Sequence, residues 1–179
     1  IDPQNDFCDL PAEWLPCSPL TGQPIAPALP VQGAHGDMLR LAGFIERHAA
    51  ALSAVTVTLD SHQRVDIAHP TFWQQGDGQP VAPFTQVSAT EVRAGRYQPR
   101  APSALPRVLR YLDELEARGR YTLMVWPVHC EIGTWGHAVH AAVQAAANSW
   151  EEHHLRQVRH VSKGVNPWTE HYSAMQAEV

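Results

Sequence analysis

The residues with the clearest chemical potential lie in the segment DSHQRVDIAHPTFW, which begins at Asp60. Asp60 and His62 follow a short apolar run, and residues two apart in an extended chain point to the same side. His69 follows in the same segment, and His129 stands in WPVHC after a second apolar run. A carboxylate with imidazoles suits Zn²⁺ best, with Fe²⁺ or Mn²⁺ as alternatives, and leaves positions open for water or substrate. The other interpretation is that Asp60 starts a turn and the histidines are solvated or paired in the core.

Asp2 and Lys163 have the chemistry of partners for a cysteine nucleophile. An ammonium group lowers the pKa of a nearby thiol from its ordinary value of about 8.5, and a carboxylate can accept the thiol proton. Each residue also has a plain alternative. A lysine that precedes a glycine at a strand end is usually a solvated charge, and Asp2 could be an acid in a turn.

None of the three cysteines has a pattern that marks it as the nucleophile. Cys130 adjoins His129, but adjacent residues of a strand point to opposite sides, so a metal-binding His129 leaves Cys130 facing inward. We expect Cys130 to be a small buried apolar residue. Cys8 stands among apolar neighbours and is expected to pack, and Cys17 lies in a proline-rich loop without a partner.

Composition excludes several functional classes. The chain has 179 residues, which predicts one domain, 1–179, large enough for a hydrophobic core. The formal charge of −5 gives no electrostatic footprint for nucleic acid. No apolar run is long enough to span a bilayer. The odd number of cysteines suits a reducing cytosol, so we expect a cytoplasmic protein.

The apolar pattern predicts strands that alternate with helices. Asp37 is predicted to cap a helix over 38–52, and further helices are predicted over 105–119 and about 137–150. Strands are predicted over 53–59, 121–126 and 157–162, and loops over 9–36 and most of 61–103. Alternation of this kind indicates an α/β fold with a largely parallel sheet. The ligand site of such a sheet lies at the carboxyl ends of its strands. Polar residues stand at or just beyond predicted strand ends, and they are expected to converge there: Asp2, Asp60, His129 and Lys163.

Four motifs, in order along the chain, resemble those of the isochorismatase-like cysteine hydrolases, and within them the nicotinamidases. IDPQNDFC resembles the opening motif that carries the catalytic aspartate. DSH with the following HPTFW resembles the metal-binding segment, and WPVHCEIGTWG is similar to the motif with a further metal-binding histidine. VSKG followed by EHYSAM resembles the segment that bears the catalytic lysine. The resemblance covers nearly all of the chain.

The resemblance implies a three-layer α/β/α sandwich with a mainly parallel sheet. It implies that Asp2 is the catalytic acid and base, that Lys163 is the catalytic lysine, and that a divalent metal binds to Asp60, His62 and His129. The spacing of His69 differs slightly from that of the second metal histidine of some relatives. Members of the family often assemble as homo-oligomers, which is the expectation for this chain.

Two departures from the family pattern qualify this expectation. The nucleophilic cysteine of the family follows the lysine segment, and these 179 residues hold no cysteine there. We therefore expect the natural domain to be longer than the sequence at both ends. His69 and His129 are also farther apart than in compact nicotinamidases, so we interpret 74–121 as an insertion that reshapes the pocket.

The leading hypothesis is a metal-containing hydrolase that converts nicotinamide to nicotinate and ammonia through a Cys–Asp–Lys triad and a thioester. Phe7, Trp14 or Trp73 could form an aromatic wall for the ring, although core packing explains each equally well. One alternative is a hydrolase of the same fold that acts on another small amide or on a vinyl ether such as isochorismate. Another is an inactive metal-binding domain, if the chain ends at Val179.

Overall fold

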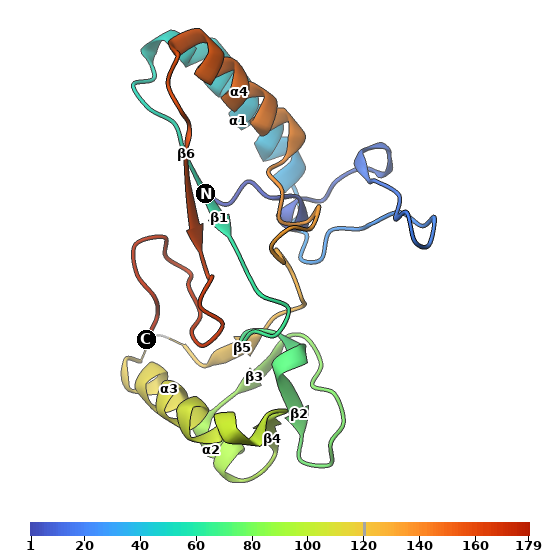
Figure 1. Cartoon of the computed structure of the whole chain (residues 1–179), viewed down its shortest axis with the longest axis vertical. Coiled ribbons are helices and arrows are strands. Elements are labelled where there is room, and N and C mark those ends of the chain that lie inside the picture. Colours follow the sequence, from blue (N-terminus) through green and yellow to red (C-terminus); the bar gives the residue numbers. More distant parts are fainter. Residues whose placement is uncertain (120) are drawn as a thin grey trace. The chain divides into compact units, whose positions relative to one another are not determined.

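The computed structural model describes residues 1–119 and 121–179, and it divides the chain into two compact units (Figure 1). The first unit comprises 1–60 and 132–162, and the second comprises 61–131 and 163–179. Each unit has its own cluster of buried apolar side chains. The assignment of 1–179 to a single domain stays a prediction.

The first unit is built on two helices that pack against each other, α1 and α4 (Figure 1). Their bounds are Ala34–His48 for α1 and Ala141–His154 for α4, and short 3₁₀ turns cover Asn5–Phe7, Ala12–Trp14 and Ala49–Ala51. Small residues on α4 allow the close approach, and Trp150 fills the space at their side. The buried residues of this core are Ala42, Ile45, Val57, Ala146, Ala147, Trp150 and Val158.

The start of α1 differs from the sequence prediction in a way that has a clear cause. Asp37 does not cap the helix, because α1 begins three residues earlier, at Ala34. The carboxylate of Asp9 accepts hydrogen bonds from the backbone N–H groups of Gly33 and His35, at 2.7 and 2.9 Å. These bonds lower the pKa of Asp9, and the bond from His35 has the largest effect. Asp9, which is distant from α1 in the sequence, therefore provides the acceptor for backbone N–H groups at the start of the helix.

Strands β1 (Thr56–Asp60) and β6 (Arg159–Lys163) are neighbours in one sheet. Arg159 N donates to Val55 O at 3.0 Å, and Ser61 N donates to Lys163 O at 2.8 Å. Residue numbers rise together along both strands, so the pair is parallel. The predicted strands 53–59 and 157–162 are thus present, shifted by one to three residues at their ends.

The second unit contains more regular structure than the sequence predicts. Most of 61–103 is loop, as predicted, but the segment also contains short elements that the sequence analysis missed, because elements with only one or two apolar residues each are hard to recognise. The segment holds β2 (Trp73–Gln75), β3 (Thr85–Val87), α2 (Ala89–Arg93) and β4 (Tyr97–Pro99), with 3₁₀ turns at Pro70–Phe72 and Pro102–Ala104. Helix α3 (Leu105–Ala117) and strand β5 (Leu123–Val125) follow. Strand β2 pairs with β4, and β3 pairs with β5, both antiparallel.

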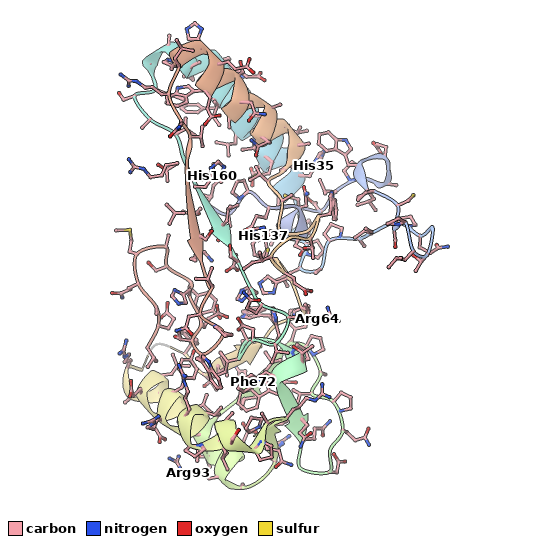
Figure 2. The ribbon with its side chains drawn as sticks, viewed as in Figure 1. His35, Arg64, Phe72, Arg93, His137 and His160 are labelled. Carbon is pink, nitrogen blue, oxygen red and sulfur yellow. The ribbon has the colours of Figure 1, made fainter. Side chains whose placement is uncertain are left out.

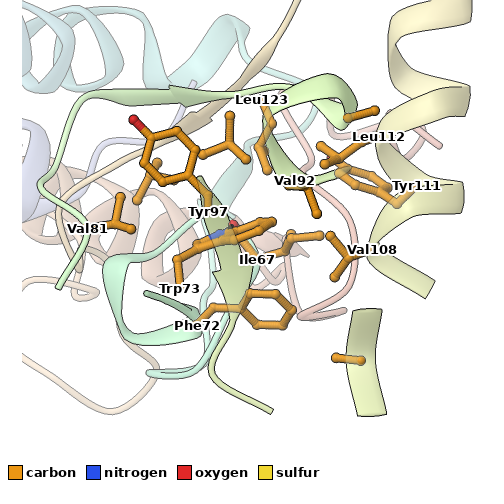
Figure 3. Close-up of a cluster of buried hydrophobic side chains, with 14 of the residues drawn as sticks. Ile67, Phe72, Trp73, Val81, Val92, Tyr97, Val108, Tyr111, Leu112 and Leu123 are labelled. Atoms are coloured by element: carbon orange, nitrogen blue, oxygen red, sulfur yellow. Dashed lines mark hydrogen bonds between the residues drawn. The ribbon is translucent and has the colours of Figure 1, made fainter. Parts of the chain in front are cut away.

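The core of the second unit lies between α3 and these short strands (Figure 3). Val108, Leu112 and Leu115 of α3 are fully buried, as the helical spacing predicts. Trp73 packs against Phe72, and its indole N–H donates to Ile67 O at 2.7 Å. Residues of 74–121, predicted to be an insertion, therefore supply a large part of this core.

The architecture is α/β with helices and a parallel strand pair, as the alternating pattern predicts. None of the helices in the described residues has the length and apolar character needed to cross a bilayer.

Candidate metal centre and the predicted catalytic residues

Three buried histidines of the second unit converge on one point. His62, His69 and His129 each offer a ring nitrogen, and these atoms lie within 4.8 Å of one another. The ring centroids are 4.8 Å apart for His62–His69 and His62–His129, and 5.2 Å apart for His69–His129. Three imidazoles from two separate stretches of chain thus face a shared space that could bind a metal.

Backbone contacts fix His62 at this point. Its N–H donates to Cys130 O at 3.0 Å, which joins the segment after β1 to the segment that carries His129. Cys130 has φ +46°, a left-handed conformation that a non-glycine residue adopts only when its surroundings impose it. Nδ1 of His62 lies 3.2 Å from Oδ2 of Asp66. The carboxylate therefore holds one ring nitrogen, and the ring is oriented by it.

His69 and His129 are held by turns of the same unit. The N–H of His69 donates to Asp66 O at 2.9 Å, and His69 begins the turn that leads into Phe72 (labelled in Figure 2). Nδ1 of His129 lies 2.8 Å from Pro127 O, and it is 3.4 Å from Nε2 of His69. Because Nδ1–H of His129 donates to a carbonyl, Nε2 is the nitrogen of this ring that would bind a metal ion. This arrangement is common at metal centres.

The electrostatics of the cluster keep His69 neutral. Burial, followed by the neighbouring rings of His62 and His129, lowers its pKa to about 4, against an opposing effect of Asp66. A neutral imidazole is the form that binds a metal ion. His69 is therefore available as a ligand at neutral pH without first losing a proton.

This shift in pKa predicts how stability depends on pH in the metal-free protein. The pKa of His69 lies below the ordinary 6.5, so the unfolded state binds its proton first as the pH falls. The free energy of unfolding has its full value above about pH 6.5, and it decreases by about 3 kcal/mol as the pH falls toward 4. Urea unfolding of chelator-treated protein at pH 7.5, 5.5 and 4.5 measures this decrease. In His69→Gln the decrease should be smaller, and an unchanged slope would contradict this assignment.

The residues present fit a metal ion of the zinc type. The donor set is three nitrogens, it is buried, and one ring is supported by a carboxylate in the way that metal-bound histidines usually are. Asp66 is fully buried, and its second oxygen accepts from Ala68 N at 3.0 Å, which fixes the carboxylate plane. The three histidines could therefore bind a divalent metal ion.

Asp66 gives a prediction about this site. Replacement by Asn keeps the shape but removes the charge that polarises His62, so metal affinity should fall by about 10–100-fold. Competition with a fluorescent zinc chelator measures the affinity. Asp77→Asn, at an exposed turn of the same unit, is the control and should bind as the wild type does. An equal affinity in Asp66→Asn would show that Asp66 does not support the site.

Asp60, predicted as a metal ligand, lies in the first unit at the end of β1 and is buried. Its backbone N–H donates to Gln4 Oε1, and its carbonyl accepts from Gln4 Nε2, both at 2.7 Å. Gln4 is fully buried and ties the end of β1 to the amino-terminal segment. This pair of bonds fixes the backbone from which the Asp60 side chain projects.

Asp2 belongs to the first unit and is supported by a threonine of β1. The Asp2 Oδ1 atom is 2.6 Å from Thr58 Oγ1, whose hydroxyl donates to it or to Ile1 O, also at 2.6 Å. Asp2 is partly buried. A charged oxygen with a hydroxyl partner at this distance has a defined orientation, which a proton-transfer role requires.

Lys163 ends β6 and belongs to the second unit. It is the one lysine among these 179 residues, which contain 13 lysines and arginines in total. Its side chain is buried, and Nζ donates to His171 O at 3.1 Å. Burial of an ammonium is costly and is seldom found without a specific role. The solvated-charge alternative is therefore not supported by its position.

The three cysteines are placed as the sequence predicts. Cys8 is buried, its Sγ donates to Gln4 O at 3.3 Å, and burial, followed by the charge of Asp9, raises its pKa to about 11. Cys130 is fully buried, and Cys17 is exposed. A thiol with a raised pKa is a poor nucleophile at neutral pH.

The three aromatic residues predicted to line a substrate pocket have different positions. Trp73 is buried in the core of the second unit, which favours the packing alternative. Trp14, in the first unit, is about one-third exposed and stacks on His140, with centroids 5.0 Å apart. Phe7 is partly buried in the turn that follows Asn5, also in the first unit.

Comparison with known structures identifies the fold of this chain. Two structures of the yeast nicotinamidase, one bound to the inhibitor nicotinaldehyde, match with TM-scores of 0.58 at 20% and 19% identity, over 98% of this chain. The Acinetobacter baumanii nicotinamidase/pyrazinamidase matches with a TM-score of 0.50 at 17% identity over 99% of this chain. The chain has the nicotinamidase fold. It spans 60% of the length of the yeast structures and 55% of the bacterial one. No protein-family model and no curated protein matches the sequence.

Some residues of the site were not recognised from the sequence. Asp66 follows His62 at a spacing of four, but the segment is not helical, so the spacing alone gives no reason to pair them. Gln4 and Thr58 support Asp60 and Asp2 from elsewhere in the chain, and only the folded structure shows this.

Proposed function

We propose that this chain is part of a metal-containing cysteine hydrolase that cleaves a small amide, nicotinamide in the first instance, to the acid and ammonia. The three-layer α/β/α arrangement, a cytoplasmic location and homo-oligomeric assembly belong to the same proposal. The observation that carries it is the buried cluster of His62, His69 and His129 on the nicotinamidase fold. Asp60, in the first unit, is proposed as an additional ligand.

Asp2 and Lys163 have separate roles in this chemistry. The carboxylate of Asp2 accepts the proton of a cysteine thiol, and the ammonium of Lys163 stabilises the thiolate. The thiolate attacks the amide carbonyl, and backbone N–H groups stabilise the oxyanion. Asp2 then returns the proton to the leaving nitrogen, so ammonia departs and a thioester remains. Water hydrolyses the thioester to the acid and regenerates the thiol.

Thr58 holds Asp2 in the orientation that both proton transfers need. His171 accepts a hydrogen bond from Lys163 through its carbonyl, which directs one N–H bond of the ammonium group. His62, His69 and His129 would hold the metal ion, which would supply Lewis-acid chemistry at this site. Phe7 and Trp14 are proposed to contact the ring of the substrate.

The nucleophile of this proposal is a cysteine outside residues 1–179. Cys8 and Cys130 are buried, and Cys17 is exposed in the proline-rich loop. The raised pKa of Cys8 is direct evidence against Cys8 as the nucleophile.

A substrate panel tests the proposal with the natural full-length protein. Nicotinamide, pyrazinamide, an aliphatic amide and isochorismate are compared by release of ammonia or pyruvate. Ammonia from nicotinamide supports the proposal. Hydrolysis of another amide or of isochorismate would identify that compound as the substrate in place of nicotinamide. No turnover of any compound, with metal bound, would identify a binding domain without activity.

A further inference from the structure

A hollow in the second unit combines apolar walls with one arginine, Arg100, and a second arginine, Arg107, lies over the ring of its Trp168 wall. Its volume is about 510 Å³, and the residues that line it include Val65, Thr71, Phe72, Arg100, Ala104 and Trp168. None of the three clustered histidines lines it. A hollow of this size accommodates a small organic ligand.

The walls suit a flat apolar group. Phe72 and Trp168 meet edge to face, with centroids 5.8 Å apart and an interplanar angle of 89°. Phe72 and Ala104 are buried and form a rigid side of the hollow (Phe72 is labelled in Figure 2). Aromatic walls at this angle give a planar ligand both edge and face contacts.

The charge at the hollow is positive. Arg100 lines it, and the guanidinium carbon of Arg107 lies 4.2 Å from the centre of the Trp168 ring. A guanidinium held over an aromatic ring keeps its in-plane N–H donors available for a carboxylate. No Asp or Glu side chain is among the lining residues.

Other arginines of this unit show what is unusual here. Arg64 pairs with Glu131 at 3.1 Å, Arg93 with Asp113 at 2.6 Å, and Arg96 with Glu91 at 3.1 Å. Within residues 1–119 and 121–179, no ion pair is recorded for Arg100, Arg107 or Arg110, and of these Arg100 lines the hollow and Arg107 lies over its Trp168 wall. Two guanidiniums without a carboxylate partner therefore stand beside an apolar hollow, and an anionic ligand would supply that partner.

We propose that this hollow binds a small aromatic carboxylate. The ring contacts Phe72 and Trp168, and the carboxylate binds to Arg100 and Arg107. The inference rests on these residues and not on the proposed reaction. If that reaction holds, its acid product belongs to the same chemical class, and the hollow is then a site for product.

Binding of 2-naphthoate to the natural full-length protein, measured by calorimetry at low salt, tests this proposal. We expect a Kd of about 0.1–1 mM and a roughly tenfold weaker Kd in Arg100→Gln and in Arg107→Gln. Arg110→Gln, one turn along α3, is the matched control, because Arg110 neither lines the hollow nor has a recorded contact with the Trp168 ring, and it should change the Kd less than about twofold. The neutral 2-naphthalenemethanol and the non-aromatic cyclohexanecarboxylate should both bind more weakly.

A carboxylate could also bind at the histidine cluster, so the same titration is made in His69→Ala after treatment with a chelator. Unchanged binding there places the ligand at the hollow. Loss of binding in that variant, with no loss in the two arginine variants, overturns the proposal, and so does equal binding of the neutral alcohol. Because no turnover is measured, failure of the proposed amide hydrolysis would not affect the result.

Discussion

His69→Ala should reduce bound zinc from about one ion per chain to almost none. Its imidazole is one of three that converge within 4.8 Å, and no other side chain of the cluster can replace its nitrogen. Loss of a direct ligand should weaken binding by about a thousandfold or more, which exceeds the effect of an outer partner such as Asp66. Elemental analysis of protein purified without chelator gives the stoichiometry, and competition with a chelator gives the affinity.

His160→Ala is the matched control, because His160 is an exposed histidine of β6 (labelled in Figure 2). It should bind the wild-type amount of zinc. Asp60→Ala makes a second comparison, since the sequence favours Asp60 as a ligand and leaves His69 as the least secure. Wild-type zinc in folded His69→Ala would show that the three-histidine site is not the metal site.

Lys163→Met should lower kcat/KM for amide hydrolysis in the natural protein by about a thousandfold or more. Methionine fills the same space without a charge, so the thiolate loses its stabilising ammonium and the pKa of the nucleophilic thiol rises. The rate of thiol alkylation by iodoacetamide, followed against pH, should move to higher pH by one unit or more. A purely structural role of Lys163 would not move this profile.

Arg159→Met is the control for charge, because Arg159 lies on the same strand and is exposed. It should leave both kcat/KM and the alkylation profile unchanged. Circular dichroism checks that Lys163→Met is folded, since the hydrogen bond to His171 O is lost in this variant. Full activity of Lys163→Met would exclude this lysine from the chemistry.

The parts of the structure that the sequence predicted are those with a strong local pattern. Helix α3 follows from apolar residues at helical spacing, and Val108, Leu112 and Leu115 are buried as expected. Strands β1 and β6 follow from β-branched runs. The short elements between Trp73 and Pro99 were missed, because their burial comes from contacts with α3 that no local pattern reveals.

For the candidate metal site, the sequence located the histidines of the cluster but not the residues that orient them. His62 and His129 were recognised from motifs, whereas the bond from His62 to Asp66 depends on a loop whose shape is set by tertiary contacts. Asp9 as the partner of the first turn of α1 is a similar case, since more than twenty residues separate it from the helix. Side chains that act across such distances need the fold before they can be assigned.

The most direct measurement is to mix the natural full-length protein with nicotinamide, quench in acid within one turnover, and map modified peptides by mass spectrometry. We expect one nicotinoyl thioester, sensitive to hydroxylamine, on a cysteine other than Cys8, Cys17 and Cys130. Ammonia release without an acylated cysteine, or an acyl group on one of these three, would contradict the proposed mechanism. The absence of both products would contradict the amidase function itself.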